Sequence, residues 1–299
     1  MCRIKPPRLP KAGTIGVAAP AGRVNREALH QGVLLLEQMG YRVCLGQSVE
    51  KAHRYFAGTD AERAEDFQAL WQNPEIDAIV CARGGYGTDR MIAHLDHPLI
   101  EKTSKICVGS SDITSLLLYL TSHNRVVFHG PMVASHLGTK PDADMQRQFV
   151  EILSGQCPEM RFDGVSIIRE GTAEGEIIGG CLTLVCMTLG TPYAIVPQDR
   201  ILFLEDVNEA PYRIDRMLSY LKRLKIFDTV RGVIFGTMPG CEPEKLPEVI
   251  LDVLGEFAFP MVWGFPSGHG AGTATLPFGV PVRLQTETRS ILLMEPAVA

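Results

Sequence analysis

The chain has 299 residues, enough for one large domain or two of ordinary size. With 45% hydrophobic and 21% charged residues, its composition is that of a globular protein with a substantial core, which excludes a disordered chain. The formal net charge of −5 and the lack of a long basic run exclude DNA binding, and they give no electrostatic attraction to an anionic membrane.

Residues 1–13 are basic and proline-rich and lack the apolar stretch of a secretory signal. The most apolar long segment, Cys181–Val196, contains Pro192 and is shorter than the roughly 20 residues that a membrane-spanning helix needs. The eight cysteines show no CxxC spacing and lie mostly in apolar runs, which favours buried thiols over disulfides or zinc. We therefore expect a cytoplasmic protein without a bound metal.

The first half of the chain alternates short apolar segments with segments that have helical spacing. Strands are expected at residues 14–19, 41–45, 76–82 and 105–109, and helices at 26–39, 60–73 and about 112–121. Such strand–helix alternation predicts an α/β fold with a parallel sheet covered by helices on both faces.

This alternation stops between about 135 and 175, where a polar helix at 142–153 precedes a segment without strong periodicity. We place a domain boundary there, giving an N-terminal domain at 1–160 and a smaller α/β C-terminal domain at 161–299. In the second domain, helices are expected at 179–189 and 213–224, and strands at 200–204, 232–236, 261–263 and 282–294.

A short loop after one predicted strand, Gly109-Ser110-Ser111-Asp112, is the sharpest candidate for chemistry. Parallel sheets bind ligands beyond the carboxyl ends of their strands. A tight strand–turn–helix connection can present Ser111 as a nucleophile, with Gly109 relieving the crowding and the helix N-terminus favouring a developing oxyanion. The loop lacks the second glycine of GxSxG, and the alternative is that Ser111 or Asp112 only caps the helix.

A second loop, Arg83-Gly84-Gly85-Tyr86-Gly87, follows another apolar strand. Its glycines let the main chain approach an anion closely and offer it N–H groups. The loop has neither the GxGxxG spacing of a dinucleotide site nor a P-loop lysine. The alternative is a tight turn at the end of a strand.

A serine nucleophile needs a base, and His269 in the flexible loop PSGHG is the best placed histidine. His129, in FHGP, also follows a strand and is a possible pocket residue. His94, Asp96 and His97 form an HxDH grouping of side chains that can bind metals, but the sequence contains no second cluster to support a metal site.

The carboxylate that would orient the base is expected among Glu205, Asp206 and Glu209, which end or follow an apolar strand. A catalytic acid is often placed at such a strand end. The alternative is that Glu205 only pairs with Arg213 or Arg216.

Together these segments resemble the LD-carboxypeptidase family over almost the whole chain, in the expected order. The matching motifs are GTIGVAAPAG, RYFAGTDAERAEDF, ARGGYGTDR, GSSDIT, FHGPM, GGCLTLVCMTLGTPY, LFLEDVNEAPYRIDRML and the GHG loop. The resemblance implies a flavodoxin-like N-terminal domain, a smaller C-terminal domain and an active site between them. It also implies a serine hydrolase that removes the terminal D-alanine from murein tetrapeptide during cytoplasmic cell-wall recycling, without a cofactor and as a homodimer.

The resemblance further implies roles for individual residues. Ser111 matches the family's nucleophile, Glu205 the glutamate of its LEDxxE motif, and His269 its histidine. Ser110 departs from the family, where relatives often carry an aromatic or histidine side chain, so the lining beside the nucleophile differs.

The oxyanion hole of the family uses main-chain amides, which map to Gly85 and Asp112. A carboxypeptidase must also bind a free carboxylate, and arginine does so with a bidentate fork. Arg83 is the first candidate for that role and Arg213 the second.

The nearest alternative is a hydrolase of the microcin C immunity type, which resembles this chain in the same motifs and cleaves a peptidyl-nucleotide amide. Those relatives tend to be longer, and no obvious inserted loop is present here. A non-catalytic binding protein would give no reason for Ser111, Glu205 and His269 to occur together. A glutamine amidotransferase-like enzyme would carry cysteine in place of Ser111.

Overall fold

The computed structural model describes residues 3–139 and 141–299. Met1 and Cys2, which begin the basic N-terminal segment, and Lys140 lie outside the described residues. Among the described residues, no helix is both long and apolar enough to cross a bilayer.

The first half forms a parallel sheet of five strands in the order β2-β1-β3-β4-β5, the order of flavodoxin-like folds. Its strands are β1 (Thr14–Ala18), β2 (Arg42–Leu45), β3 (Ala78–Cys81), β4 (Ile106–Gly109) and β5 (Val127–His129). Its helices are α1 (Arg26–Gln38), α2 (Asp60–Gln72), α3 (Thr88–Ile92), α4 (His97–Lys102) and α5 (Thr114–Ser122), with shorter turns η1 (Gln47–Glu50), η2 (Ser111–Ile113) and η3 (Val133–Leu137). The expected fold class is confirmed.

Local sequence explains the ends of these helices. Asn25 accepts a hydrogen bond from the Ala28 N–H and so begins α1, which buries Leu29, Gly32 and Leu36 on one face. At the start of α2, Thr59 and Glu62 form a reciprocal capping box, which satisfies main-chain N–H groups in the first turn.

The second half continues the same sheet with the order β12-β8-β9-β10-β11-β7. Its strands are β7 (Ser166–Arg169), β8 (Thr172–Cys181), β9 (Ile201–Glu205), β10 (Gly232–Thr237), β11 (Met261–Gly268) and β12 (Leu276–Phe278). A branch from β8 adds β13 (Pro281–Gln285), β14 (Ser290–Leu293) and β6 (Glu159–Arg161), all antiparallel. The helices are α6 (Ala143–Leu153), α7 (Leu182–Thr188), α8 (Pro211–Arg223) and α9 (Leu246–Leu254), with the turn η4 (Ile226–Thr229).

Two glycines differ from the sequence expectation. The expected helix at 179–189 begins only at Leu182, because Gly179 and Gly180 belong to the end of β8. A Cβ at Gly179 would lie 1.9 Å from the Phe203 carbonyl oxygen in β9, and one at Gly180 would lie 2.5 Å from Thr114 Oγ1. Glycine, which has no side chain, is therefore required at both positions so that β8 can pair with β9 and α5 can pack against β8.

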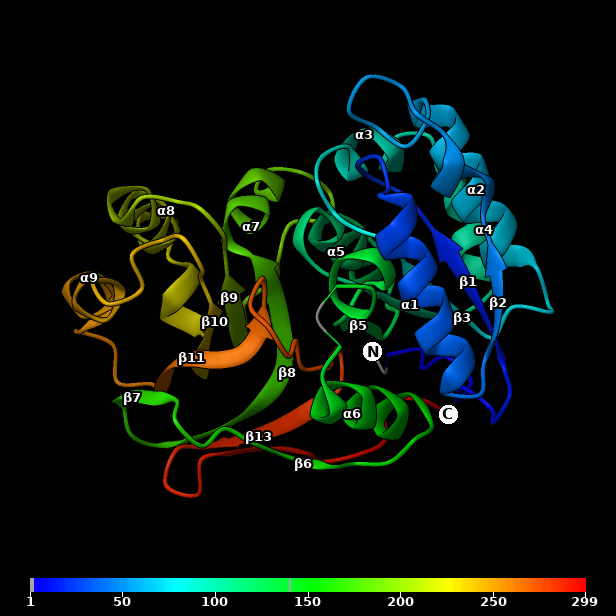
Figure 1. Cartoon of the computed structure of the whole chain (residues 1–299). Helices are drawn as coiled ribbons and strands as arrows, with labels where there is room; N and C mark the ends of the chain where they lie inside the picture. Colours follow the sequence, from blue (N-terminus) through cyan, green and yellow to red (C-terminus); the bar gives the residue numbers. More distant parts are fainter. Residues whose placement is uncertain (1–2, 140) are drawn as a thin grey trace.

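The two halves meet along β12, which pairs with β5 on one side and β8 on the other. In Figure 1 the blue and cyan elements of the first half lie on the right and the yellow and orange elements of the second half on the left, with the green α5, α7 and β8 between them. Leu118 of α5 packs in the same apolar cluster as Leu202 of β9. The Thr114 hydroxyl, three residues after Ser111, accepts a hydrogen bond from the Cys181 N–H at 3.1 Å. The helix after Ser111 is thereby attached to the second half of the chain.

Candidate active site

Ser111 occupies a strained turn between β4 and α5. Its φ is +60°, a left-handed conformation that typically costs about 1–3 kcal/mol for a non-glycine residue and that clusters at functional sites. A Cβ at Gly109 would lie 2.5 Å from Ile113 Cγ2, so glycine is needed to turn directly from strand to helix. No side chain caps η2 or α5, and the Asp112 carboxylate instead accepts hydrogen bonds from Thr88. The role of helix cap is therefore not filled by either residue.

His269 brings Ser111 and Glu205 into one hydrogen-bonded series. Its Nε2 lies 2.9 Å from Ser111 Oγ, and its Nδ1 lies 2.6 Å from Glu205 Oε2. The imidazole follows β11, and the Gly270 N–H donates to Thr237 Oγ1 at 2.9 Å, which holds the loop. With a proton on Nδ1 directed at Glu205, the lone pair on Nε2 can accept the Ser111 proton.

Glu205, the last residue of β9, is fully buried. Burial opposes its charge, but the charge and the hydrogen bond of His269, together with the nearby His129 ring, lower the pKa of Glu205 to about 2. For His269, burial likewise opposes the charged ring, and the Glu205 carboxylate overcomes it and raises the pKa of the imidazole. The pair is therefore arranged to hold an imidazolium once His269 takes a proton.

The other two candidate carboxylates serve the fold. Asp206 accepts hydrogen bonds from the N–H and hydroxyl of Thr183, both at 2.9 Å, at the start of α7, and burial raises the pKa of Asp206. Glu209 forms an ion pair with Arg213. The alternative that Glu205 only pairs with Arg213 or Arg216 is wrong, because the Glu205 oxygens face His269 and His129.

Two further histidines surround Glu205 and His269. His129, at the end of β5, is fully buried with its Nε2 3.8 Å from Glu205 Oε1. Among the described residues neither of these two atoms has a hydrogen-bond partner. The Ser267 hydroxyl, which donates to the Ala274 carbonyl at 2.9 Å, lies 3.3 Å from His129 Nδ1. His129 thus backs the carboxylate on the side away from His269.

His136 was not predicted from the sequence. It lies in η3, and its Nδ1 accepts a hydrogen bond from the Met132 N–H at 3.0 Å. Burial lowers its pKa to about 4, although a hydrogen bond to the Gly268 main chain opposes this shift. In the sequence, the only feature that could have pointed to His136 is its place four residues after the FHGPM motif. The neutral His136 ring contacts the main chain of Gly268, the last residue of β11, and so helps to position His269, the next residue.

Ser111, His136 and His269 face a cavity of about 360 Å³, whereas Glu205 and His129 are buried behind them. Its lining residues are Arg83, Gly84, Gly85, Ser111, Met132, Ser135, His136, Val207, His269 and Gly270. The predicted residues Arg83, Gly85, Ser111 and His269 therefore line one hollow, whereas Arg213 is not among its lining residues.

The RGGYG loop lies directly against Ser111. A Cβ at Gly84 would lie 2.7 Å from Ser111 Cβ and 3.1 Å from the Asp112 nitrogen. Among the described residues, the main-chain N–H groups of Gly85 and Asp112 have no hydrogen-bond acceptor. Both are thus available to a ligand in the cavity.

Arg83 stabilises its own loop. Its Nε donates to the Gly84 carbonyl at 3.0 Å, and its Nη1 donates to the Arg23 carbonyl at 3.1 Å. Only part of the guanidinium is left for a substrate carboxylate.

A serine hydroxyl, an imidazole and a carboxylate in one hydrogen-bonded series, at the carboxyl edge of an α/β sheet, form the arrangement that serine hydrolases use. Residues 15–130 match the LD-carboxypeptidase N-terminal domain, and residues 174–284 match the LD-carboxypeptidase C-terminal domain. The chain belongs to the LD-carboxypeptidase family of serine peptidases, and the expected resemblance is confirmed. The boundary near residue 160 lies between the two matched regions and stays a prediction.

Curated relatives match nearly the whole chain. A putative carboxypeptidase of Streptomyces coelicolor is 38% identical over 99% of this chain and 97% of its own length. A probable murein peptide carboxypeptidase of Bacillus subtilis is 34% identical over 97% and 94%. The murein tetrapeptide carboxypeptidase of Pseudomonas aeruginosa is 33% identical over 90% and 92%.

Similar solved structures include a microcin immunity protein and a muramoyltetrapeptide carboxypeptidase. The microcin C7 self-immunity protein MccF in complex with glutamyl sulfamoyl guanosine is 25% identical, with a TM-score of 0.93 and 99% of both chains covered. The muramoyltetrapeptide carboxypeptidase from Oxalobacter formigenes is 29% identical, with a TM-score of 0.82 and coverage of 94% and 97%. The two-domain α/β architecture is common to all three.

Proposed function

We propose that this protein is a serine LD-carboxypeptidase that removes the terminal D-alanine from murein tetrapeptide. The observation that carries the proposal is the hydrogen-bonded series Ser111–His269–Glu205, whose first two members line one cavity. Support for the substrate comes from relatives at 33% and 34% identity that are named murein tetrapeptide and murein peptide carboxypeptidases.

In the proposed reaction His269 accepts the Ser111 proton while Oγ attacks the carbonyl between the diamino acid and D-alanine. The oxyanion is stabilised by the N–H groups of Gly85 and Asp112, and such donors each contribute about 10²–10³ in rate. His269 then protonates the leaving amine, and D-alanine departs. Water, deprotonated by the same imidazole, hydrolyses the acyl-enzyme. Glu205 keeps the ring oriented and stabilises its charged form.

A second candidate function is hydrolysis of a peptidyl-nucleotide amide, as in microcin C immunity. It is favoured by one observation, the likeness to MccF over 99% of both chains. This chain has no obvious inserted loop that would contact a nucleotide. We therefore keep it second to the murein peptide.

The deciding experiment incubates the purified protein with L-Ala-γ-D-Glu-meso-diaminopimelate-D-Ala and follows products by mass spectrometry. Loss of one alanine is expected, and Ser111→Ala should be slower by about 10⁶. Parallel incubation with aspartyl sulfamoyl adenosine tests the second function. An intact tetrapeptide beside a cleaved nucleotide conjugate would reverse the order of the two functions, and cleavage by Ser111→Ala would remove Ser111 from the mechanism.

Two parts of the proposal rest on the resemblance to the family, namely a cytoplasmic role in peptidoglycan recycling and a homodimeric state. Light scattering of the purified protein measures the oligomeric state directly. Cell fractionation measures whether the protein is in the cytoplasm.

A further inference from the structure

A second hollow, of about 520 Å³, opens beside the candidate active site. Three arginines and two tyrosines line it, together with Gly22 and Gly85, and we call it the arginine cleft. These side chains are Arg23, Arg54, Tyr55, Arg83 and Tyr86. Because Arg83 and Gly85 also line the cavity at Ser111, one extended ligand can occupy both hollows.

The arginine cleft concentrates positive charge that the protein does not neutralise. No acidic side chain is among its lining residues, although the whole chain carries a net charge of −5. Among the described residues, the guanidinium groups of Arg23 and Arg54 make no hydrogen bond or ion pair. The nearby carboxylate of Asp60 is already paired with Arg63 and Arg90. Like charges gathered without counter-charge favour the binding of an anion.

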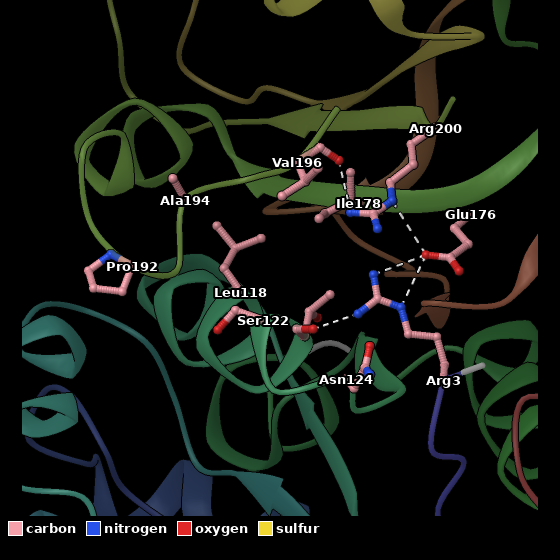
Figure 2. Close-up of a pocket in the computed structure, with 11 residues that line it drawn as sticks. Arg3, Leu118, Ser122, Asn124, Glu176, Ile178, Pro192, Ala194, Val196 and Arg200 are labelled. Atoms are coloured by element: carbon pink, nitrogen blue, oxygen red, sulfur yellow. Dashed lines mark hydrogen bonds and ion pairs between the residues drawn. The ribbon is translucent and has the colours of Figure 1, made fainter. Parts of the chain in front are cut away.

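Another arginine cluster in the same protein shows the contrast. In the cavity of Figure 2, Arg3 and Arg200 share one carboxylate, with distances to Glu176 Oε2 of 3.1 Å and 3.4 Å. Arg3 also donates to the Thr121 carbonyl, and Arg200 to that of Val196. That cluster is satisfied by the protein itself and is structural. Within residues 3–139 and 141–299, no carboxylate pairs with Arg23 or Arg54 in this way.

The arginine cleft is built on main chain that is held in place. The Gly22 N–H donates to the Gly84 carbonyl at 3.2 Å, and the Arg23 N–H donates to the Tyr55 carbonyl at 3.0 Å. Arg54 has a φ of +54°, a strained conformation of the kind that clusters at ligand sites. The loops that carry the three arginines are therefore fixed to one another before any ligand binds, which lowers the entropy lost on binding.

The two tyrosines provide an exposed aromatic wall. Tyr55 is 55% exposed and Tyr86 is 50% exposed, and their ring centroids are 6.0 Å apart. Both rings pack on the buried Phe56, with centroid distances of 4.3 Å and 5.5 Å. Two exposed aromatic rings lie beside guanidinium groups that have no counter-charge. This combination suits a ligand with an extended apolar or peptide portion and one carboxylate.

We propose that the arginine cleft binds a second carboxylate of the substrate, remote from the bond that Ser111 attacks. The inference rests on the proposed function for the identity of that substrate. In the tetrapeptide the D-glutamate is joined through its γ-carboxyl, so its α-carboxylate is free, and it lies one residue before the diamino acid. One or two residues span roughly 3.5–7 Å, the scale of a step from Gly85 into the adjoining hollow. Arg23 and Arg54 bind that carboxylate, and the tyrosine rings pack along the peptide.

The test is a double-mutant cycle in which one change is made in the protein and the other in the substrate. Two tetrapeptides are compared, one with D-glutamate and one with D-isoglutamine, whose carboxamide removes the charge. Wild-type protein should prefer the D-glutamate peptide in kcat/KM by about tenfold at low salt, and in R23Q/R54Q the preference should fall to about onefold. Raising the salt concentration should weaken the preference of the wild type.

The control is Arg42→Gln, which removes one arginine charge at the amino-terminal ends of β1 and β2, whereas the arginine cleft follows the carboxyl ends of β1 and β3. It should keep the wild-type preference. Calorimetric titration of Ser111→Ala with both peptides measures the same preference without turnover. If wild type cleaves the tetrapeptide but R23Q/R54Q keeps the full preference, the subsite is overturned and the proposed function stands. If the tetrapeptide is neither cleaved nor bound, both the proposed function and this subsite are overturned.

Discussion

Replacing Glu205 by glutamine tests the proposed roles of the buried carboxylate and the imidazole. Glutamine is nearly isosteric, but its amide N–H₂ can donate to His269 Nδ1, which lies 2.6 Å from the present Oε2. The imidazole would then carry its proton on Nε2, facing Ser111, and could not accept the serine proton. The lost charge would also leave the imidazolium without the carboxylate that raises its pKa.

We expect kcat to fall by about 10⁴ at neutral pH, the effect of the wrong tautomer in a serine protease. The assay is release of alanine from the tetrapeptide at saturating substrate, with circular dichroism to confirm folding. Asp206→Asn is the matched control, because Asp206 is the neighbouring buried carboxylate but accepts hydrogen bonds from Thr183 instead of a histidine. Near-normal kcat in Glu205→Gln, or an equal loss in Asp206→Asn, would refute the orientation argument.

Three further predictions follow from the same geometry. Gly84→Ala should lower kcat sharply while the protein stays folded, because the new Cβ would lie 2.8 Å from Ser111 Oγ; unchanged turnover would contradict the contact. The acidic limb of the kcat/KM profile should have its midpoint above pH 6.5, since the base must be neutral and Glu205 raises the pKa of His269; a midpoint below 6.5 in the pH profile would argue against this pair. Thr114→Val should reduce the free energy of unfolding by about 1–3 kcal/mol in urea titrations, because the buried Cys181 N–H loses its acceptor; a neutral result would mean that the N–H finds another.

The parts of the fold that could be predicted are those in which local sequence and buried environment agree. The fully apolar segments around β3 and β4 have every residue buried, and the helices α1 and α2 have clear caps. The helix α9 escaped prediction, since its nine residues give only two and a half turns and follow a proline-rich segment. The strands β6 and β7 were missed because they are short, antiparallel and only partly buried.

The candidate site divides in the same way. The glycine before the GSSD turn and the apolar strand and helix around it are local signals, so Ser111 could be singled out from its own loop. Choosing Glu205 over Asp206 could not be done locally, because the two adjacent side chains leave the strand in opposite directions and only the fold shows which one meets His269. His136 escaped for a related reason. Its importance comes from contact with Gly268, which lies more than a hundred residues further along the chain.

The position of β12 late in the chain has a consequence for the timing of synthesis. The proposed nucleophile is Ser111 and the proposed base is His269, while β12, at Leu276–Phe278, is the strand that connects β5 to β8. Chains grow from the N-terminus at about 5–20 residues per second, so the first five strands are available many seconds before the sheet can close. Until the segment that contains His269 and β12 has been synthesised, Ser111 has no imidazole beside it. The order of residues along the chain thus keeps the proposed nucleophile and base apart until the second half of the sheet has been synthesised.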